Sequence, residues 1–171
     1  LFKTKTSEGT AVGNILISMA LSSWARVYDH ADLDQIVTPA ARPVVNRIAE
    51  NCIQNPAQIL ASVPAASALN VTFLSNPPWD TEPWRAILAD NTPGDARTDA
   101  PILITQGEAD PVVSPAVQQQ FVDRLCQTGA TVDYRTYSGV GHVTVAHDTA
   151  PDVTQWIADR FAGTPAPSSC P

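Results

Sequence analysis

Apolar residues near the start of the chain recur at the spacing of an α-helix. Ile15 and Met19 lie one turn apart, and Trp24 and Val27 continue the same stripe. This pattern is typical of a helix with one apolar face and predicts such a helix over residues 10–27.

Proline and glycine mark the ends of further segments in the first half of the chain. Helices are predicted over 38–52, where Pro39 opens the segment, over 56–69, and over 82–90. The turn residues 91–94, Asn-Thr-Pro-Gly, end the last of these helices. Nothing in this half is predicted to be a strand.

The pattern changes at Pro101, where strand-like apolar runs begin to alternate with helical segments. The predicted elements are strand 101–106, helix 115–128, strand 131–137 and helix 151–161. A βαβα order predicts two neighbouring parallel strands joined by a right-handed helical crossover. Because parallel strands are normally buried on both faces, we expect further strands from an upstream segment beside them.

Two residues able to carry acid–base chemistry follow the two predicted strands. Asp110 comes just after the first strand, and His142 follows the second in the sequence Gly139-Val140-Gly141-His142. Ligands of open parallel sheets bind at the carboxyl ends of the strands, so both side chains are expected there. Gly139 and Gly141 predict a tight backbone path at positive φ that brings the histidine inward.

An acid followed by a histidine in this order matches the α/β-hydrolase layout. In ester cleavage His142 would take the proton of a hydroxyl nucleophile and return it to the leaving alkoxide. Asp110 would hold the imidazole in one tautomer and stabilise its charged form. No Gly-x-Ser-x-Gly occurs in the 171 residues. We therefore expect the nucleophilic serine on an upstream segment and this chain to be inactive alone.

Each candidate also has a simpler interpretation. Asp110, which precedes Pro111, could form a turn or cap the following helix, and His142 could be an ordinary loop histidine. For His30 and His147 an ordinary role without chemistry is favoured. His147 in particular lacks the pattern of a zinc-binding helix. No metal ligand is predicted.

Charge and hydropathy narrow the class of partners. The net charge is −7 with only 10 Lys and Arg residues, which argues against nucleic acid and anionic membrane as partners. No apolar run approaches the roughly 20 residues of a membrane span, so no stable membrane anchor is predicted. An uncharged ester or lipid substrate remains compatible with this composition.

Three cysteines make an odd count. A bridge between Cys126 and Cys170 would attach the tail to the rest of the chain, whereas three unrelated buried thiols are the alternative. With that bridge Cys52 is unpaired, and its partner is then expected on the upstream half of the same enzyme.

Several segments together resemble the secretory lipase family of bacteria and fungi. The resemblance is carried by residues 91–94, 106–110, 139–142, 151–153 and 156–161. It extends from Trp84 to Cys170, and residues 8–70 resemble, less sharply, the helical cap of that family. The motifs at 106–110 and 139–142 are shared with many α/β-hydrolases.

The resemblance implies the carboxyl-terminal part of an α/β-hydrolase fold, with its last parallel strands and helices, preceded by a mostly helical cap. The domains implied are a cap or lid over residues 1–76 and the core segment over 77–171. The implied protein is a secreted serine-type lipase or esterase that acts on acylglycerols or other carboxylic esters and needs no cofactor. A disulfide between Cys126 and Cys170 is implied as well. The alternative is a noncatalytic binding or assembly module derived from a hydrolase half.

Tryptophans in the cap region have two interpretations. Trp24, Trp79 and Trp84 could line an acyl-binding cavity, although apolar residues at helical spacing are more often core. Trp156 is predicted to be core. Asn70-Val71-Thr72 fits the pattern of an N-glycosylation acceptor.

Overall fold

The computed structural model describes residues 11–51, 56–69 and 73–171. The chain forms two compact units, Leu1–Asn91 and Thr92–Pro171. This division comes later than the predicted one between residues 76 and 77. The reason is that Trp84 and Ile87 are buried in the core of the first unit, which keeps their helix there. Cys52 and the sequence at 70–72 lie outside the described residues.

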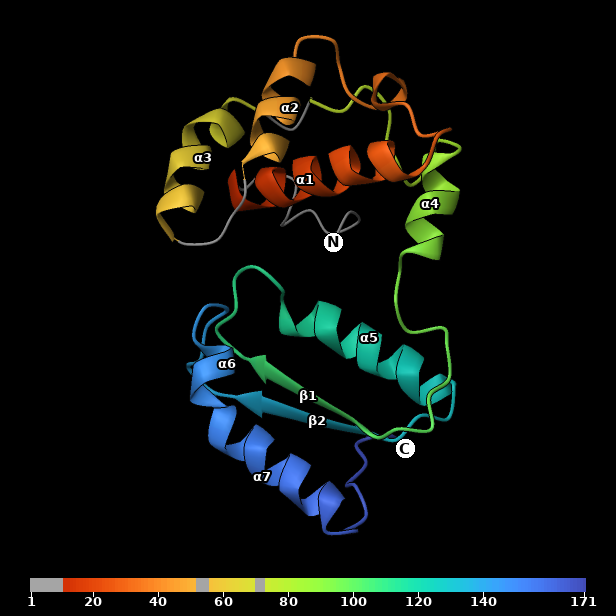
Figure 1. Cartoon of the computed structure of the whole chain (residues 1–171), viewed down its shortest axis with the longest axis vertical. Helices are drawn as coiled ribbons and strands as arrows, with labels where there is room; N and C mark the ends of the chain where they lie inside the picture. The colour runs from red at the N-terminus through yellow and green to blue at the C-terminus, as the bar shows by residue number, and fades with distance from the viewer. Residues whose placement is uncertain (1–10, 52–55, 70–72) are drawn as a thin grey trace. The chain divides into compact units, whose positions relative to one another are not determined.

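The first unit is helical (Figure 1). It contains α1 (Ala11–Val27), α2 (Arg42–Glu50), α3 (Pro56–Ala68), α4 (Trp84–Asp90) and a short 3₁₀ helix, η1 (Leu33–Gln35). α1 packs against both α2 and α3, and α2 also contacts α3. The four predicted helices are therefore confirmed, with their boundaries shifted by a few residues.

Long-range backbone contacts account for the late start of α2, which was predicted to begin at residue 38. The Thr38 N–H donates to the Phe73 carbonyl at 2.9 Å. Next to it, Val37 and Leu74 form an isolated antiparallel bridge. Val37 is therefore held in a bridge to a distant segment, and the Thr38 carbonyl accepts from the Ala41 and Arg42 N–H groups in the turn from which the helix begins.

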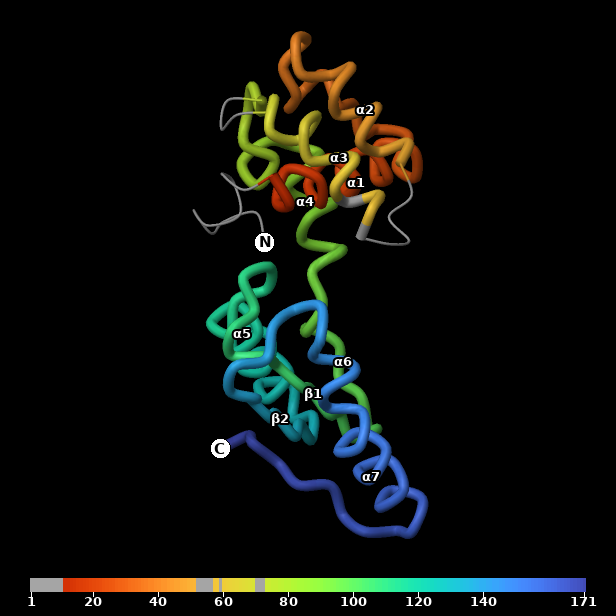
Figure 2. The backbone as a smooth tube through the Cα atoms, turned by 90° about the vertical axis from the view of Figure 1, so that its left-hand side faces the viewer, coloured from red at the N-terminus to blue at the C-terminus, as the bar shows by residue number. Residues whose placement is uncertain are grey.

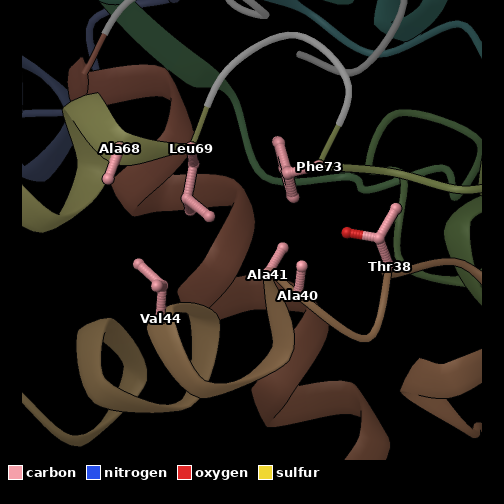
Figure 3. A pocket seen from close by; sticks show the side chains of 7 residues that line it. All are labelled: Thr38, Ala40, Ala41, Val44, Ala68, Leu69 and Phe73. Carbon is pink, nitrogen blue, oxygen red and sulfur yellow. The ribbon is translucent and has the colours of Figure 1, made fainter.

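Trp84 belongs to the core of this unit and is fully buried. Its indole N–H donates to the Asp32 carbonyl at 3.0 Å, which satisfies the one polar group of the side chain. Trp24 packs against the same core from its edge. A pocket of about 190 Å³ in this unit (Figure 3) includes none of the three tryptophans considered as cavity lining. It is lined by Thr38, Ala40, Ala41, Val44, Ala68, Leu69 and Phe73.

The second unit has the predicted βαβα order. It contains β1 (Ile102–Gly107), α5 (Pro115–Gln127), β2 (Val132–Tyr137), α6 (Val145–Asp148) and α7 (Ala150–Phe161). β1 and β2 are parallel, and Ile102 pairs with Val132 at one end and Gly107 with Tyr137 at the other. Both strands therefore end at the same edge, which places the two loops that follow them side by side.

Helices lie on both faces of this strand pair, as Figures 1 and 2 show. On one face Ile104 and Tyr134 join a small core around Val122 and Leu125 of α5. On the other face the Thr149 hydroxyl, between α6 and α7, is 3.4 Å from the Thr105 hydroxyl. Tyr137 donates from its hydroxyl to Asp152 of α7 at 2.8 Å.

The carboxyl-terminal tail is attached to this unit by a disulfide between Cys126 and Cys170. Ser169 adds backbone pairing along β2, since its N–H donates to the Val132 carbonyl at 2.6 Å. Its hydroxyl accepts from the Tyr134 N–H at 2.9 Å. The tail thus covers the outer edge of β2.

Candidate active site

Asp110 and His142 meet at the edge where both strands end. His142 Nδ1 lies 2.9 Å from Asp110 Oδ2. The two residues come from loops that follow strands in matched register, since Gly107 and Tyr137 are paired as the last residues of β1 and β2. The structure therefore brings together the two side chains that the sequence selects as acid and base.

The Asp110 carboxylate is sheltered, with 5% of its side chain exposed. Its second oxygen, Oδ1, accepts from the backbone N–H groups of Val112 at 2.8 Å and Val113 at 2.9 Å. Burial alone would raise the pKa of Asp110, but the hydrogen bonds from Val113, His142 and Val112 outweigh it and lower that pKa. The carboxylate is thereby kept ionised beside the imidazole.

His142 is about half exposed, with 45% of its side chain accessible to solvent. Because an ionised carboxylate can only accept, Nδ1 is the ring nitrogen that carries the proton and donates to Asp110. Nε2 is then the acceptor of the neutral ring. A histidine oriented in this way can take a proton at Nε2 while Asp110 stabilises the resulting imidazolium.

Backbone hydrogen bonds tie the two loops together. The Glu108 N–H donates to the Tyr137 carbonyl, and the Ala109 N–H donates to the Val140 carbonyl, each at 3.0 Å. These bonds cross from the acid loop to the segment that leads to His142. The relative positions of acid and base are thus fixed by backbone as well as by side chains.

Glycines allow this close approach, though only one of the two predicted glycines needs positive φ. Gly139 has φ of 75°, as expected. Gly141 is not in the left-handed region, and a Cβ there would meet only Ala109 O at 3.9 Å. The prediction for Gly141 is therefore wrong. The glycine that sequence reasoning missed is Gly107, where a Cβ would overlap the backbone carbonyl of Val140.

The simpler interpretations of Asp110 can be weighed against its contacts. The cap of α5 is Ser114, whose hydroxyl accepts from the Val117 N–H at 3.4 Å. Asp110 does form a turn with Val112 and Val113, but its other oxygen contacts His142. The turn therefore orients the Asp110 carboxylate toward His142. Helix capping does not explain the position of Asp110, because Ser114 caps α5.

The other two histidines contact residues close to them in the sequence. His147 is 92% exposed and its Nδ1 lies 3.0 Å from Asp148 Oδ1. His30 makes an edge contact with the Tyr28 ring in the helical unit. Among the described residues, no three His, Cys, Asp or Glu side chains gather where a metal ion could bind. Within the same residues, every helix is too short or too polar to cross a bilayer.

Comparison with known proteins gives consistent results. The model of the secretory lipase family matches residues 5–169. Secreted triacylglycerol lipase LIP7 of Malassezia globosa is 36% identical over 66 residues, which is 37% of this chain and 14% of that protein. The chain thus spans a small part of that relative.

Solved structures of Candida antarctica lipase A share the fold. The closed-state structure superposes with a TM-score of 0.65 at 18% identity, covering 95% of this chain and 39% of that one. A second structure of the same lipase gives a TM-score of 0.59 at 18% identity, with 92% and 37% covered. The predicted α/β-hydrolase fold class is confirmed. Because the family model spans nearly all of its residues, the chain belongs to the secretory lipase family.

Proposed function

We propose that this chain supplies the acid, Asp110, and the base, His142, of a secreted serine-type carboxylic ester hydrolase. The observation that carries the proposal is the 2.9 Å contact between His142 Nδ1 and a buried, ionised Asp110. A serine on an upstream segment would complete the triad, so this chain alone would be inactive. Acylglycerols are the favoured substrates, because the relative from Malassezia globosa is named a triacylglycerol lipase.

The chemistry follows from the orientation of the imidazole. The serine hydroxyl donates to Nε2 of His142, and its oxygen attacks the ester carbonyl as the proton moves to the ring. Asp110 stabilises the imidazolium formed in that step. When the tetrahedral intermediate collapses, the same proton goes to the leaving alkoxide, and water repeats the cycle on the acyl-enzyme.

Serines of this chain fit the nucleophile role poorly. Ser18 and Ser22 are buried in α1 of the helical unit. Ser114 is the N-cap of α5. None of the serines lies in a Gly-x-Ser-x-Gly sequence, the strand-to-helix turn that exposes the nucleophile in this fold.

Secretion is also proposed, on two grounds. A disulfide such as Cys126–Cys170 persists in oxidising compartments. The matching family is described as secretory. Because Cys126 and Cys170 pair with each other, Cys52 would pair with a cysteine on the upstream half of the enzyme or stay free.

Fluorophosphonate labelling, read by intact mass with and without reductant, tests the assignment. We expect this chain to stay unlabelled and any label to appear on a segment that carries the serine elbow. A label on this chain would show that one of its own serines is the nucleophile. In the enzyme that contains that segment, His142→Ala should lower ester turnover by about 10⁴-fold or more with little loss of folding. Unchanged turnover would remove His142 from the mechanism.

A further inference from the structure

Gln106 is a buried amide in a strand that otherwise presents apolar side chains to α5. It is the second-last residue of β1 and only 4% exposed. On the same face Ile102 and Ile104 pack against the core of the unit. An amide buried in place of an apolar side chain destabilises the fold unless its N–H groups find acceptors.

Both acceptors of the Gln106 amide lie in the turn that carries Asp110. Nε2 donates to the Gly107 carbonyl at 2.8 Å and to the Val113 carbonyl at 3.2 Å. Because carbonyl oxygens only accept, the amide nitrogen must face them, which fixes the orientation of the side chain. One amide thus links Gly107, at the start of the turn, to Val113, at its end.

The same two backbone residues also hold Asp110. The Gly107 carbonyl accepts from the Asp110 N–H at 3.3 Å. The Val113 N–H donates to Asp110 Oδ1 at 2.9 Å. Gln106 therefore acts one hydrogen bond away from the atoms that set the position and ionisation of the acid.

We infer that Gln106 is a positioning residue, whose buried amide fixes the Asp110 turn and so keeps His142 Nδ1 on the carboxylate. The inference rests on the proposed function, since positioning matters only if the pair is catalytic. Gln106 acts through the backbone of Gly107 and Val113, to whose carbonyls its amide donates.

A spectroscopic test uses the enzyme that includes the upstream segment, and its readout does not depend on turnover. Hydrogen-bonded imidazole N–H protons give low-field proton resonances, and loss of one in His142→Ala assigns it to His142. Gln106→Met keeps the approximate shape and removes both donors, and we expect it to abolish or broaden that resonance. Gln119→Met is the matched control, because Gln119 is an exposed amide of α5 that bonds to Asp123 at 2.8 Å. We expect the control to keep the resonance. A resonance retained in Gln106→Met would overturn the inference.

A kinetic test uses the enzyme that includes the segment carrying the serine. We expect Gln106→Met to lower kcat by about tenfold or more, as removal of an outer supporting partner often does, with KM unchanged. Gln119→Met should leave both constants as they are. If Gln106→Met does not fold, Gln106→Asn shortens the reach of the amide by one methylene and should cause the same two losses. Wild-type behaviour of Gln106→Asn in both tests would then refute the role.

The two tests separate failure of this inference from failure of the proposed function. If His142→Ala lowers turnover and Gln106→Met changes neither the resonance nor kcat, the positioning role is wrong. If Gln106→Met removes the resonance while His142→Ala leaves turnover unchanged, the pair is positioned as inferred but is not catalytic.

Discussion

Replacing Gly107 by alanine tests whether close backbone contact fixes the acid and base loops. A Cβ at this position would lie 2.8 Å from the carbonyl carbon of Val140 and closer still to its oxygen. Backbone cannot rotate away as a flexible side chain can, so the segment before His142 must move. Overpacking of this kind costs about 1–3 kcal/mol. Loss of the bond from the Ala109 N–H to the Val140 carbonyl adds about 1 kcal/mol. Gly107→Ala should therefore destabilise the α/β unit by about 2–4 kcal/mol.

Two neighbouring glycines provide matched controls for the same substitution. At Gly141 a Cβ would meet only Ala109 O at 3.9 Å. Gly141→Ala should leave stability unchanged or raise it by up to about 1 kcal/mol. At Gly139 a Cβ meets nothing within 4 Å, but φ is +75°. Gly139→Ala should lower stability by about 1–2 kcal/mol through backbone strain alone.

Amide hydrogen exchange along β2 is the appropriate assay, because it reports the opening of the α/β unit separately from the helical unit. The expected order of stability is Gly141→Ala, then Gly139→Ala, then Gly107→Ala. Equal protection in Gly107→Ala and Gly141→Ala would refute the argument that contact with Val140 fixes the loops.

Two further predictions concern ionisation and the tail. The pKa of Asp110 is lower in the folded chain than its ordinary value, so the ionised carboxylate stabilises the fold above the unfolded pKa of about 4. That contribution is lost as the pH falls through the folded pKa. The difference in unfolding free energy between the wild type and Asp110→Asn, measured by urea unfolding, should therefore become smaller below about pH 4. A difference that stays constant with pH would contradict this. Joint replacement of Cys126 and Cys170 by serine opens a loop with a sequence separation of 44. The double variant should lose about 4 kcal/mol of unfolding free energy in the chain-entropy model. It should also lose exchange protection at the Ser169 amide, and full protection there would show that the tail holds without the bridge.

Local patterns were sufficient to predict most of the helices and strands and the proximity of Asp110 and His142. Helical periodicity near Ile15 and apolar runs bounded by Pro and Gly locate elements because these signals lie within a few residues of one another. Asp110 and His142 could be selected because parallel strands in register bring the loops after them to one edge.

Features decided by distant residues could not be predicted in the same way. The start of α2 depends on the bond between Thr38 and Phe73. The unit boundary depends on burial of Trp84, whose indole reaches the Asp32 carbonyl. The need for glycine at 107 arises from Val140, which no local pattern reveals. For Gln106 a signal was present, since a polar residue interrupts an apolar strand face. Its role could not be predicted, because that role depends on the carbonyls that its amide contacts in the folded chain.

The tail also limits where this sheet can grow. Ser169 bonds to Val132 and Tyr134 along the outer edge of β2, and the Cys126–Cys170 disulfide holds it there. A strand added beside β2 would have to displace these bonds. β1 is bonded to β2 on one side only within the described sheet. Exposed strand edges readily pair with another strand. The upstream strands expected from the parallel order would therefore pair with the free edge of β1, which is the strand that leads to Asp110.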